Sequence, residues 1–302
     1  MTNGVLTLIA RAKARDFVAP AVDLSRQALE AVGATVRGPD WLGPVACDIF
    51  WTGPTTETAD SAVRQALADH FGPIPIDIVA QESEGRRKRL LVADMESTII
   101  ENEMLDEMAD LRGERGRVAE ITRRAMNGEV DFAAALLERV ALFKGTTEDE
   151  LADVGSRIHY TPGASALVRT MIADGARAIL VSGGFHVFAD PVARALGFTR
   201  CYANDLVLAD GRLTGSVREP VLGAAAKRDI LLACAAEFAV AIEDTLAVGD
   251  GANDVPMLKE AGLGIAFHAK PTVRAAVPTR IDHANLTALL YIQGYRETQI
   301  VG

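Results

Sequence analysis

Residues 90–98 read LLVADMEST, and this stretch decides the fold of the 302-residue chain. Four apolar residues come first, and two carboxylates, Asp94 and Glu96, follow them. A short continuous apolar run is typical of a strand that is buried on both faces of a parallel sheet. The pattern therefore predicts a strand that delivers both carboxylates to the edge of a sheet.

The same texture recurs further along the chain. Apolar runs that end in polar or glycine-rich turns span residues 178–181, 246–249 and 263–267. Segments with helical spacing lie among them, at residues 164–173, 186–196, 227–236 and 255–261. Alternation of buried strands with helices predicts an α/β fold with a doubly wound parallel sheet.

One interval breaks this alternation. Between Asp94 and Gly163 the chain has helical pattern but no strand, over about twice the length of an ordinary crossover. We expect a helical cap inserted at about residues 101–160. Such a cap would sit over the carboxyl ends of the strands, where ligands bind in these sheets.

Two turn signals complete this part of the chain. Thr161-Pro162-Gly163 predicts the start of the next helix, with proline at the first helical position. Asp210-Gly211 lies between two strand-like segments and predicts a hairpin turn.

Residues 4–80 have a different organisation. Their pattern predicts strand, helix, strand, strand, helix and strand at residues 5–9, 23–32, 34–37, 46–51, 58–71 and 74–80. Asp23 is the expected N-cap of the first helix. This order predicts an α+β ferredoxin-like unit. The segment shows no cluster of catalytic residue types, which favours regulation or dimerisation over chemistry.

The polar segment 81–89 separates the two textures and predicts domains at 1–85 and 86–302. It ends in the basic run Arg86-Arg87-Lys88-Arg89. We interpret these charges as a solvated linker, with a nucleic-acid contact as the alternative.

Composition excludes several classes of protein. There are 31 basic and 41 acidic residues, a net charge of −10, which argues against non-specific nucleic-acid binding. No uncharged apolar run reaches the roughly 18 residues of a membrane span, and the N-terminus does not read as a signal peptide. The cysteines, Cys47, Cys201 and Cys234, lack metal-ligand spacing, so we expect free thiols in a reducing cytoplasm.

Polar groups follow several of the expected strands. A carboxylate can attack phosphorus to give an aspartyl-phosphate, and a second carboxylate can supply acid/base catalysis. Ser182-Gly183-Gly184 offers a hydroxyl and backbone N–H groups to an anion. The loop of residues 249–254, GDGAND, offers oxygen ligands that suit magnesium. Lys227, at a helix start, could neutralise phosphate charge, although most such lysines are solvated.

This ordered set of motifs resembles the haloacid dehalogenase-like (HAD) phosphatase superfamily over roughly residues 90–290. The resemblance implies an HAD-like Rossmann-type sheet, with Asp94 as nucleophile and Glu96 as the acid/base. It implies phosphoryl binding by Ser182, Gly183, Gly184 and Lys227, and a Mg²⁺ held by Asp94, Asp250 and the backbone carbonyl of Glu96. Asn253 and Asp254 would orient the metal, phosphate and lysine.

Within that superfamily the motifs resemble the phosphoserine phosphatases most closely. This implies that Glu103 binds the substrate ammonium and that Arg139 binds its carboxylate, a task that guanidinium geometry suits. Met126 and Phe132 would line and close the pocket. The family does not use the position of His186 as an acid/base, so we expect a surface or capping histidine there. By element order alone, residues 1–85 resemble ACT-like regulatory modules.

Glu96 departs from the phosphoserine phosphatase pattern, which usually has aspartate. Glutamate is one methylene longer, about 1.5 Å of reach. A related family, the phosphoserine:homoserine phosphotransferases, carries Asp-x-Glu here, so the final acceptor, water or another alcohol, stays open. The leading hypothesis is hydrolysis of O-phosphoserine, the last step of the phosphorylated serine biosynthesis route. The alternatives are phosphoryl transfer to homoserine and a catalytically inactive amino-acid sensor.

The charge balance sharpens the expectation of a metal. Residues 1–85 hold 11 acidic and 6 basic residues, a net −5, and the remaining 217 residues carry the other −5. The expected pocket gathers five carboxylates against Lys227 and Arg139, and should repel phosphate unless a cation binds first. We therefore expect obligatory Mg²⁺, a small-molecule substrate, neither nucleic acid nor membrane as a partner, and leave a homodimer open.

Overall fold

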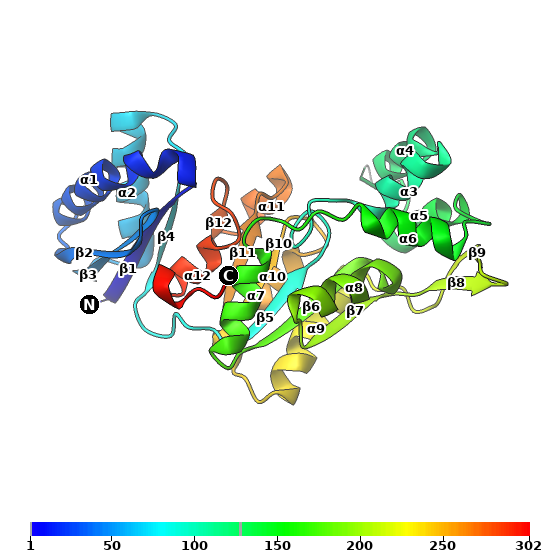
Figure 1. Ribbon diagram of the computed structural model, residues 1–302. Helices are drawn as coiled ribbons and strands as arrows, with labels where there is room; N and C mark the ends of the chain where they lie inside the picture. The colour runs from blue at the N-terminus through cyan, green and yellow to red at the C-terminus, as the bar shows by residue number, and fades with distance from the viewer. Residues whose placement is uncertain (1, 127–128) are drawn as a thin grey trace.

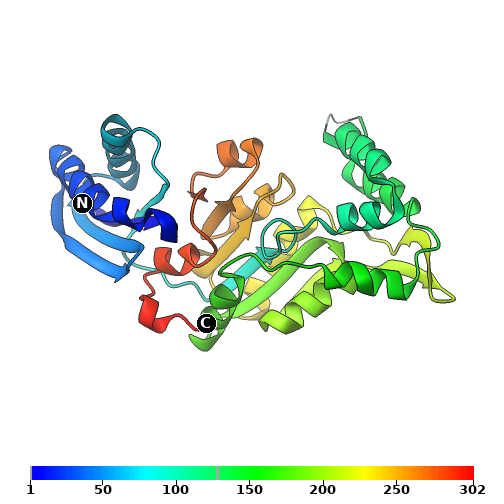
Figure 2. The same cartoon turned by 45° about the horizontal axis from the view of Figure 1, so that its top comes forward.

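The computed structural model describes residues 2–126 and 129–302. Figures 1 and 2 show three parts in a row: an N-terminal unit (residues 2–82), a central sheet with its helices, and a cap at the far end. The polypeptide thus places the N-terminal unit and the cap on opposite sides of the central sheet.

The central sheet has six parallel strands in the order β12-β11-β10-β5-β6-β7. These strands are β5 (Leu90–Asp94), β6 (Arg177–Phe185), β7 (Arg200–Asn204), β10 (Thr245–Gly249), β11 (Leu263–Phe267) and β12 (Arg280–Ile281). The strand order reverses between β5 and β10, and side chains at such a switch point converge on one crevice. The predicted doubly wound parallel sheet is confirmed.

Alternate residues of β5 face opposite layers of helices. Leu91 and Ala93 belong to one buried cluster, with residues of α7 (Ala164–Ala173) and α8 (His186–Leu196). Leu90 and Val92 belong to the cluster on the other face. The helices of that face are α9 (Ala224–Glu237), α10 (Val255–Glu260) and α11 (Pro271–Ala276). Burial on both faces is the physical reason for the continuous apolar run at residues 90–93.

The cap consists of four helices, α3 (Met104–Arg112), α4 (Arg115–Met126), α5 (Phe132–Ala141) and α6 (Glu148–Ser156). Two chain segments connect it to the sheet and pair with each other. The N–H of Glu101 donates to His159 O at 2.8 Å, and the N–H of Thr161 donates to Ile99 O at 3.0 Å. These paired segments are called the cap hinge below.

The hairpin at Asp210-Gly211 extends the cap. Strands β8 (Leu206–Ala209) and β9 (Arg212–Val217) flank the turn, whose two residues have φ of 50° and 70°. Leu213 exchanges backbone hydrogen bonds with Gly145 and Thr146 of the cap. Figure 1 shows the hairpin running beside α5 and α6. The sequence predicted the hairpin but not this contact, which joins segments far apart in the chain.

The start of α7 differs from the prediction. The helix begins at Ala164, and Gly163 is its N-cap, so Pro162 is not the first helical residue. Gly163 has φ of 88°, and a Cβ there would lie 2.6 Å from the backbone nitrogen of Thr287. The positive φ and the close approach of two backbones both favour glycine at position 163, and no local sequence pattern reveals that approach.

The N-terminal unit has four antiparallel strands in the order β2-β3-β1-β4. Its elements are β1 (Thr2–Ala10), α1 (Val18–Ala31), β2 (Thr35–Gly43), β3 (Ala46–Gly53), α2 (Thr56–Phe71) and β4 (Ile76–Glu82), with a 3-10 helix at Ala12–Phe17 before α1. Further 3-10 helices, at Ile242–Asp244 and Glu297–Gln299, lie in the rest of the chain. The predicted ferredoxin-like arrangement is confirmed, although α1 begins at Val18, so Asp23 lies inside the helix and not at its N-cap.

The two faces of the N-terminal sheet have different partners. Helices α1 and α2 cover one face, while α12 (Ala288–Ile292) contacts the other. Ile9, Ala46 and Val79 therefore belong to the same buried cluster as Tyr291. The N-terminal unit therefore packs, through the second face of its sheet, against α12 of the central part of the chain.

Arg86 connects the two parts. It is 9% exposed, and Nη1 donates to Asp48 Oδ2 at 2.7 Å. Its Nε donates to Ile292 O at 3.0 Å and its Nη2 to Tyr291 O at 3.2 Å. The interpretation of residues 86–89 as a solvated linker is therefore wrong for Arg86, because its partners come from segments about 40 and 200 residues away.

A second buried carboxylate supports the docking. Asp77 accepts backbone N–H groups of Asp282 at 2.7 Å, of His283 at 3.2 Å and of Ala284 at 2.8 Å. Three N–H donors fix the loop after β12 against β4.

Among the helices of residues 2–126 and 129–302, none is both long and apolar enough to span a bilayer.

We expect Arg86→Met to lower the free energy of unfolding by about 3–5 kcal/mol, because Asp48 and two carbonyls lose a buried donor. Denaturant unfolding followed by tryptophan fluorescence measures this, since both tryptophans, Trp41 and Trp51, lie in the N-terminal unit. Arg15→Ala, which removes an exposed ion pair, is the matched control and should change stability by less than about 0.5 kcal/mol. Equal stability of Arg86→Met and wild type would contradict the role of Arg86 in docking.

Candidate active site

Three carboxylates meet at the switch point of the sheet. Asp94 ends β5, and Asp250 and Asp254 follow β10, which is the neighbouring strand. One oxygen from each of the three lies within 4.8 Å of the others, and all three residues are buried. The adjacency of β5 and β10 therefore assembles an acidic cluster from segments about 155 residues apart.

Lys227 neutralises part of this cluster. The residue is 1% exposed, and its Nζ donates to Asp94 Oδ1 and, at 2.6 Å, to Asp254 Oδ1. Burial opposes the ammonium form, but the two carboxylates outweigh it and hold the pKa of Lys227 above its ordinary value. Lys227 is thus a charged internal group and not a solvated lysine.

One lysine does not balance three carboxylates. Burial, followed by the charge of Asp254, raises the pKa of Asp94 well above its ordinary value. Burial also raises the pKa of Asp250 to about 6, although Lys270 Nζ lies 3.5 Å from Asp250 Oδ2. A buried set of oxygen donors with excess negative charge fits a hard divalent cation. Lys270, which follows β11, was missed because no motif marked that strand end.

The loop after β10 is held by its own side chains. Asp254 Oδ2 accepts the N–H of Gly251 at 2.9 Å, and a Cβ at Gly251 would lie 2.3 Å from Asn253 Oδ1. A larger residue at position 251 would therefore require the Asn253 side chain to move. Asp254 therefore fixes both the loop and Lys227, while Asn253 packs against the same turn.

Glu96 lies between the sheet and the cap. Its Oε1 accepts the N–H of Met104, the first residue of α3, at 2.9 Å. Burial and the nearby charge of Glu103 raise the pKa of Glu96 to about 7. A carboxyl group with this pKa can both donate and accept a proton near neutrality.

The end of β6 supplies a small polar cradle. Ser182 Oγ accepts the N–H of Gly184 at 2.9 Å, and Asn204 Nδ2 donates to Gly183 O at 2.8 Å. A Cβ at Gly184 would lie 3.1 Å from both carboxylate oxygens of Glu96 and from Ser182 Oγ. Asn204, a buried residue that sequence reasoning missed, holds the backbone of this cradle from β7.

The cap brings further charged groups to the site. Glu103 precedes α3 and accepts a hydrogen bond from Ser97 Oγ at 2.7 Å on Oε1. Arg139 Nε donates to Ala135 O at 3.2 Å. Burial lowers the pKa of Arg139, while Glu96, Asp106 and Glu103 oppose that shift in this order. Arg139 and Glu103 are therefore close enough to Glu96 for their charges to interact with it.

Two expected pocket residues cannot be placed fully. Met126 ends α4 and Phe132 begins α5, but their side chains lie outside the described part of the structure. Their roles stay predictions.

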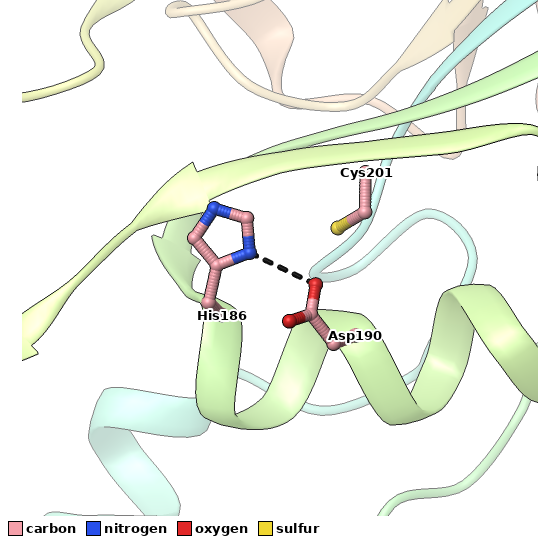
Figure 3. A group of neighbouring side chains, drawn as sticks. All are labelled: His186, Asp190 and Cys201. Atoms are coloured by element: carbon pink, nitrogen blue, oxygen red, sulfur yellow. Dashed lines mark hydrogen bonds and ion pairs between the residues drawn. The ribbon is translucent and has the colours of Figure 1, made fainter.

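A second group of ligating residue types lies beside α8 (Figure 3). His186 Nδ1 lies 2.9 Å from Asp190 Oδ1, and the N–H of Ala203 donates to His186 Nε2 at 3.3 Å. Because Nε2 accepts, the neutral ring carries its proton on Nδ1, which leaves no lone pair there for a metal. Burial and the charge of Asp190 raise the pKa of the Cys201 thiol to about 12. We therefore assign this group a structural role, in which His186 joins the start of α8 to β7.

We expect Gly184→Ala to lower kcat/KM about 100-fold while leaving the fold intact, because Glu96 or Ser182 must move by a few tenths of an ångström. Steady-state kinetics together with thermal unfolding separate the two effects. Gly116→Ala is the matched control, since Gly116 lies in α4 with open space around its Cβ position. Wild-type kinetics for Gly184→Ala would show that the approach of Gly184 to Glu96 has no catalytic consequence.

The fold and the site define a class of protein, one with a doubly wound parallel sheet and a buried cluster of carboxylates at its switch point. The profile of the haloacid dehalogenase-like hydrolase family matches residues 91–259. A phosphoserine phosphatase of Lactococcus lactis is 45% identical over 203 residues, which cover 67% of this chain and 94% of the relative. The chain belongs to the haloacid dehalogenase-like hydrolases and, within them, to the family of the phosphoserine phosphatases.

Solved structures agree with this assignment. An HAD-family hydrolase from Salmonella enterica superposes with a TM-score of 0.83 at 26% identity, covering 97% of this chain and 98% of that one. A phosphoserine phosphatase described as a phospho-aspartyl intermediate analogue has a TM-score of 0.64 at 38% identity, covering 68% and 98%. The first likeness covers nearly the whole chain and so includes the N-terminal unit.

Proposed function

We propose that this protein hydrolyses O-phosphoserine to serine and phosphate in a Mg²⁺-dependent reaction, the last step of the phosphorylated serine biosynthesis route. The observation that carries the proposal is the buried pair of Asp94 and Lys227 beside Glu96. It supplies a nucleophile, a fixed positive charge and a proton carrier at one strand end.

In the first half-reaction Asp94 attacks phosphorus and forms an aspartyl-phosphate. The bond between phosphorus and the serine oxygen breaks, and Glu96 gives its proton to that oxygen. Lys227, the hydroxyl of Ser182 and the backbone of Gly183 and Gly184 offset charge on the phosphoryl oxygens.

In the second half-reaction Glu96 removes a proton from water. The water oxygen bonds to phosphorus, the bond to Asp94 breaks, and phosphate leaves. The pKa of about 7 at Glu96 supports this exchange of roles, since neither protonation state is strongly disfavoured near neutrality.

Asp94, Asp250 and the backbone carbonyl of Glu96 would hold the metal, with Asp254 in support. A bound Mg²⁺ supplies positive charge that offsets the phosphate and keeps the carboxylates ionised. The excess of buried carboxylates over lysine supports this part of the proposal.

The cap would provide the amino-acid contacts. Glu103 would bind the substrate ammonium and Arg139 its carboxylate, while Met126 and Phe132 would line the pocket and Asn253 would contact the phosphate side. Closure of the cap through its hinge would exclude bulk water. The shared electrostatic environment of Glu103, Arg139 and Glu96 supports this assignment.

The proposed division of the chain has an N-terminal domain at 1–85 and a catalytic domain at 86–302, with the cap at about 101–160. The N-terminal domain would serve in regulation or in pairing two chains. The edge strand β2 would favour a homodimer, because its outer side has no partner strand within the described residues. The free cysteines support a cytoplasmic location.

We expect Asp94→Asn to lose at least about 10³-fold in kcat for phosphate release from phosphoserine, because the amide is not a nucleophile. Wild-type enzyme treated with EDTA should also lose activity and regain it with added Mg²⁺. Asp190→Asn, which changes a half-exposed carboxylate outside the site, is the matched control and should keep wild-type activity. Full activity of Asp94→Asn would overturn the mechanism, and a wild type that is inert with Mg²⁺ would favour the inactive amino-acid sensor.

One observation favours testing a second acceptor. Glutamate at position 96 matches the phosphoserine:homoserine phosphotransferase pattern. We expect free phosphate as the product even with excess homoserine, and Glu96→Asp should retain that preference. ³¹P NMR of the products measures the partition, and phosphohomoserine as the main product would replace hydrolysis by transfer.

A further inference from the structure

Lys270 is a charged residue beside the active site that the proposed mechanism does not use. It follows β11, which pairs with β10, and its backbone N–H donates to Asp250 O at 3.1 Å. Its Nζ lies 3.5 Å from Asp250 Oδ2. Both the main chain and the side chain of Lys270 therefore lie against Asp250, one of the three carboxylates at the switch point.

The loop that carries Lys270 is also held from its other side. His268 has φ of 45°, a left-handed conformation that is costly for a residue with a Cβ. Its N–H donates to Ile281 O at 2.8 Å, and its Nε2 donates to Ala284 O at 2.8 Å. Two residues further on, Lys270 is the N-cap of α11. The fold therefore fixes the backbone of Lys270 beside Asp250, while the length of the lysine side chain lets its ammonium move.

Carboxylates from the sheet and from the cap act on the ammonium of Lys270. Burial opposes its charged form, but the charges of Asp250, Glu103 and Asp94 hold the pKa of this lysine above its ordinary value. In return, Lys270 is the group that most strongly opposes the raised pKa of Asp250. Asp94 is the proposed nucleophile, so a phosphoryl group bound at Asp94 would also lie within the electrostatic reach of Lys270.

Exposure distinguishes Lys270 from the other lysine of the site. Lys227 is 1% exposed and lies between Asp94 and Asp254. The side chain of Lys270 is 57% exposed, and a surface ion pair of this kind contributes little to stability. A divalent cation bound at Asp250 would repel an ammonium so close to its ligand. Lys270 can therefore leave Asp250 at little cost, whereas Lys227 cannot leave its buried partners.

We propose that Lys270 is an exchangeable counter-ion of the metal site: its ammonium pairs with Asp250 before a divalent cation binds, and the bound cation displaces it towards the phosphoryl group of the substrate. In this role Lys270 lowers the affinity of the site for the cation, because two positive charges compete for one carboxylate. It raises the affinity for an anionic substrate once the cation is bound. The effect on the substrate rests on the proposed function, whereas the competition with a cation does not.

Cation binding in the absence of substrate tests the first step. Mn²⁺ is a suitable probe, because it prefers the same oxygen ligands as Mg²⁺ and the EPR signal of the free ion gives its Kd. We expect Lys270→Met to lower the Kd of Mn²⁺ about 10-fold at low ionic strength, and Lys270→Arg to keep the wild-type Kd. Lys259→Met, which removes an exposed lysine from the last turn of α10, is the matched control and should change the Kd less than about 2-fold. An unchanged or higher Kd in Lys270→Met would overturn the exchange.

Steady-state kinetics at saturating Mg²⁺ test the second step. Lys270→Met should raise KM for phosphoserine about 10-fold with kcat within about 3-fold of wild type, and Lys270→Arg should restore KM. A merely structural role would not change the affinities for cation and substrate in opposite directions. An unchanged KM in Lys270→Met would overturn the contact with the substrate. If the wild type proved inactive towards phosphoserine, the proposed function would fail, while the Mn²⁺ titrations would still decide whether Lys270 competes with the cation.

Discussion

The buried contact of Lys227 with Asp94 and Asp254 is the interaction on which the site depends. Two carboxylates so close in a region of low exposure repel each other, and burial together with the charge of Asp254 raises the pKa of Asp94, which Lys227 opposes. In the proposed mechanism Asp94 must be ionised to attack phosphorus, so the charge of Lys227 favours the form of Asp94 that this chemistry needs. Because one lysine cannot balance Asp250 as well, the same arrangement suits a divalent cation, which in the proposed reaction would let substrate phosphate meet positive charge rather than an acidic pocket.

Topology explains why these groups meet at all. Helices α7 and α8 cover one face of the sheet, and α9 to α11 cover the other. Strands β5 and β10 are neighbours at the point where the strand order reverses. Their loops diverge and leave a crevice. The cap, inserted directly after β5, then lies over that crevice, and its hinge starts only a few residues after the nucleophile. The position of this insertion would therefore couple motion of the cap to Asp94 and Glu96, the carboxylates of the proposed reaction.

The sequence predicted what depends on local pattern. The strand before Asp94, the doubly wound sheet and the order of elements in the N-terminal unit all follow from periodicity and turn chemistry. It could not predict contacts between distant segments. Arg86 reads as a solvated charge until Asp48 and the carbonyls near residue 292 surround it. The backbone at Thr287 approaches Gly163, the N-cap of α7, and Asn204 reaches the Ser182 turn from a strand without any motif. Each miss depends on which segments the fold brings together.

Glutamate at position 96 has a structural consequence beyond its acid/base chemistry. Its Oε1 accepts the N–H of Met104, the first residue of the first cap helix, so the proton carrier is tied to the cap rather than only to the sheet. An aspartate, shorter by about 1.5 Å, would not span the same distance without movement of the backbone. Because Gly184 leaves almost no free space on the other side, the glutamate is confined between cap and cradle. A shift of the cap therefore acts on the carboxyl of Glu96 through this hydrogen bond, and in the proposed mechanism it would link the position of the cap to proton transfer in both half-reactions.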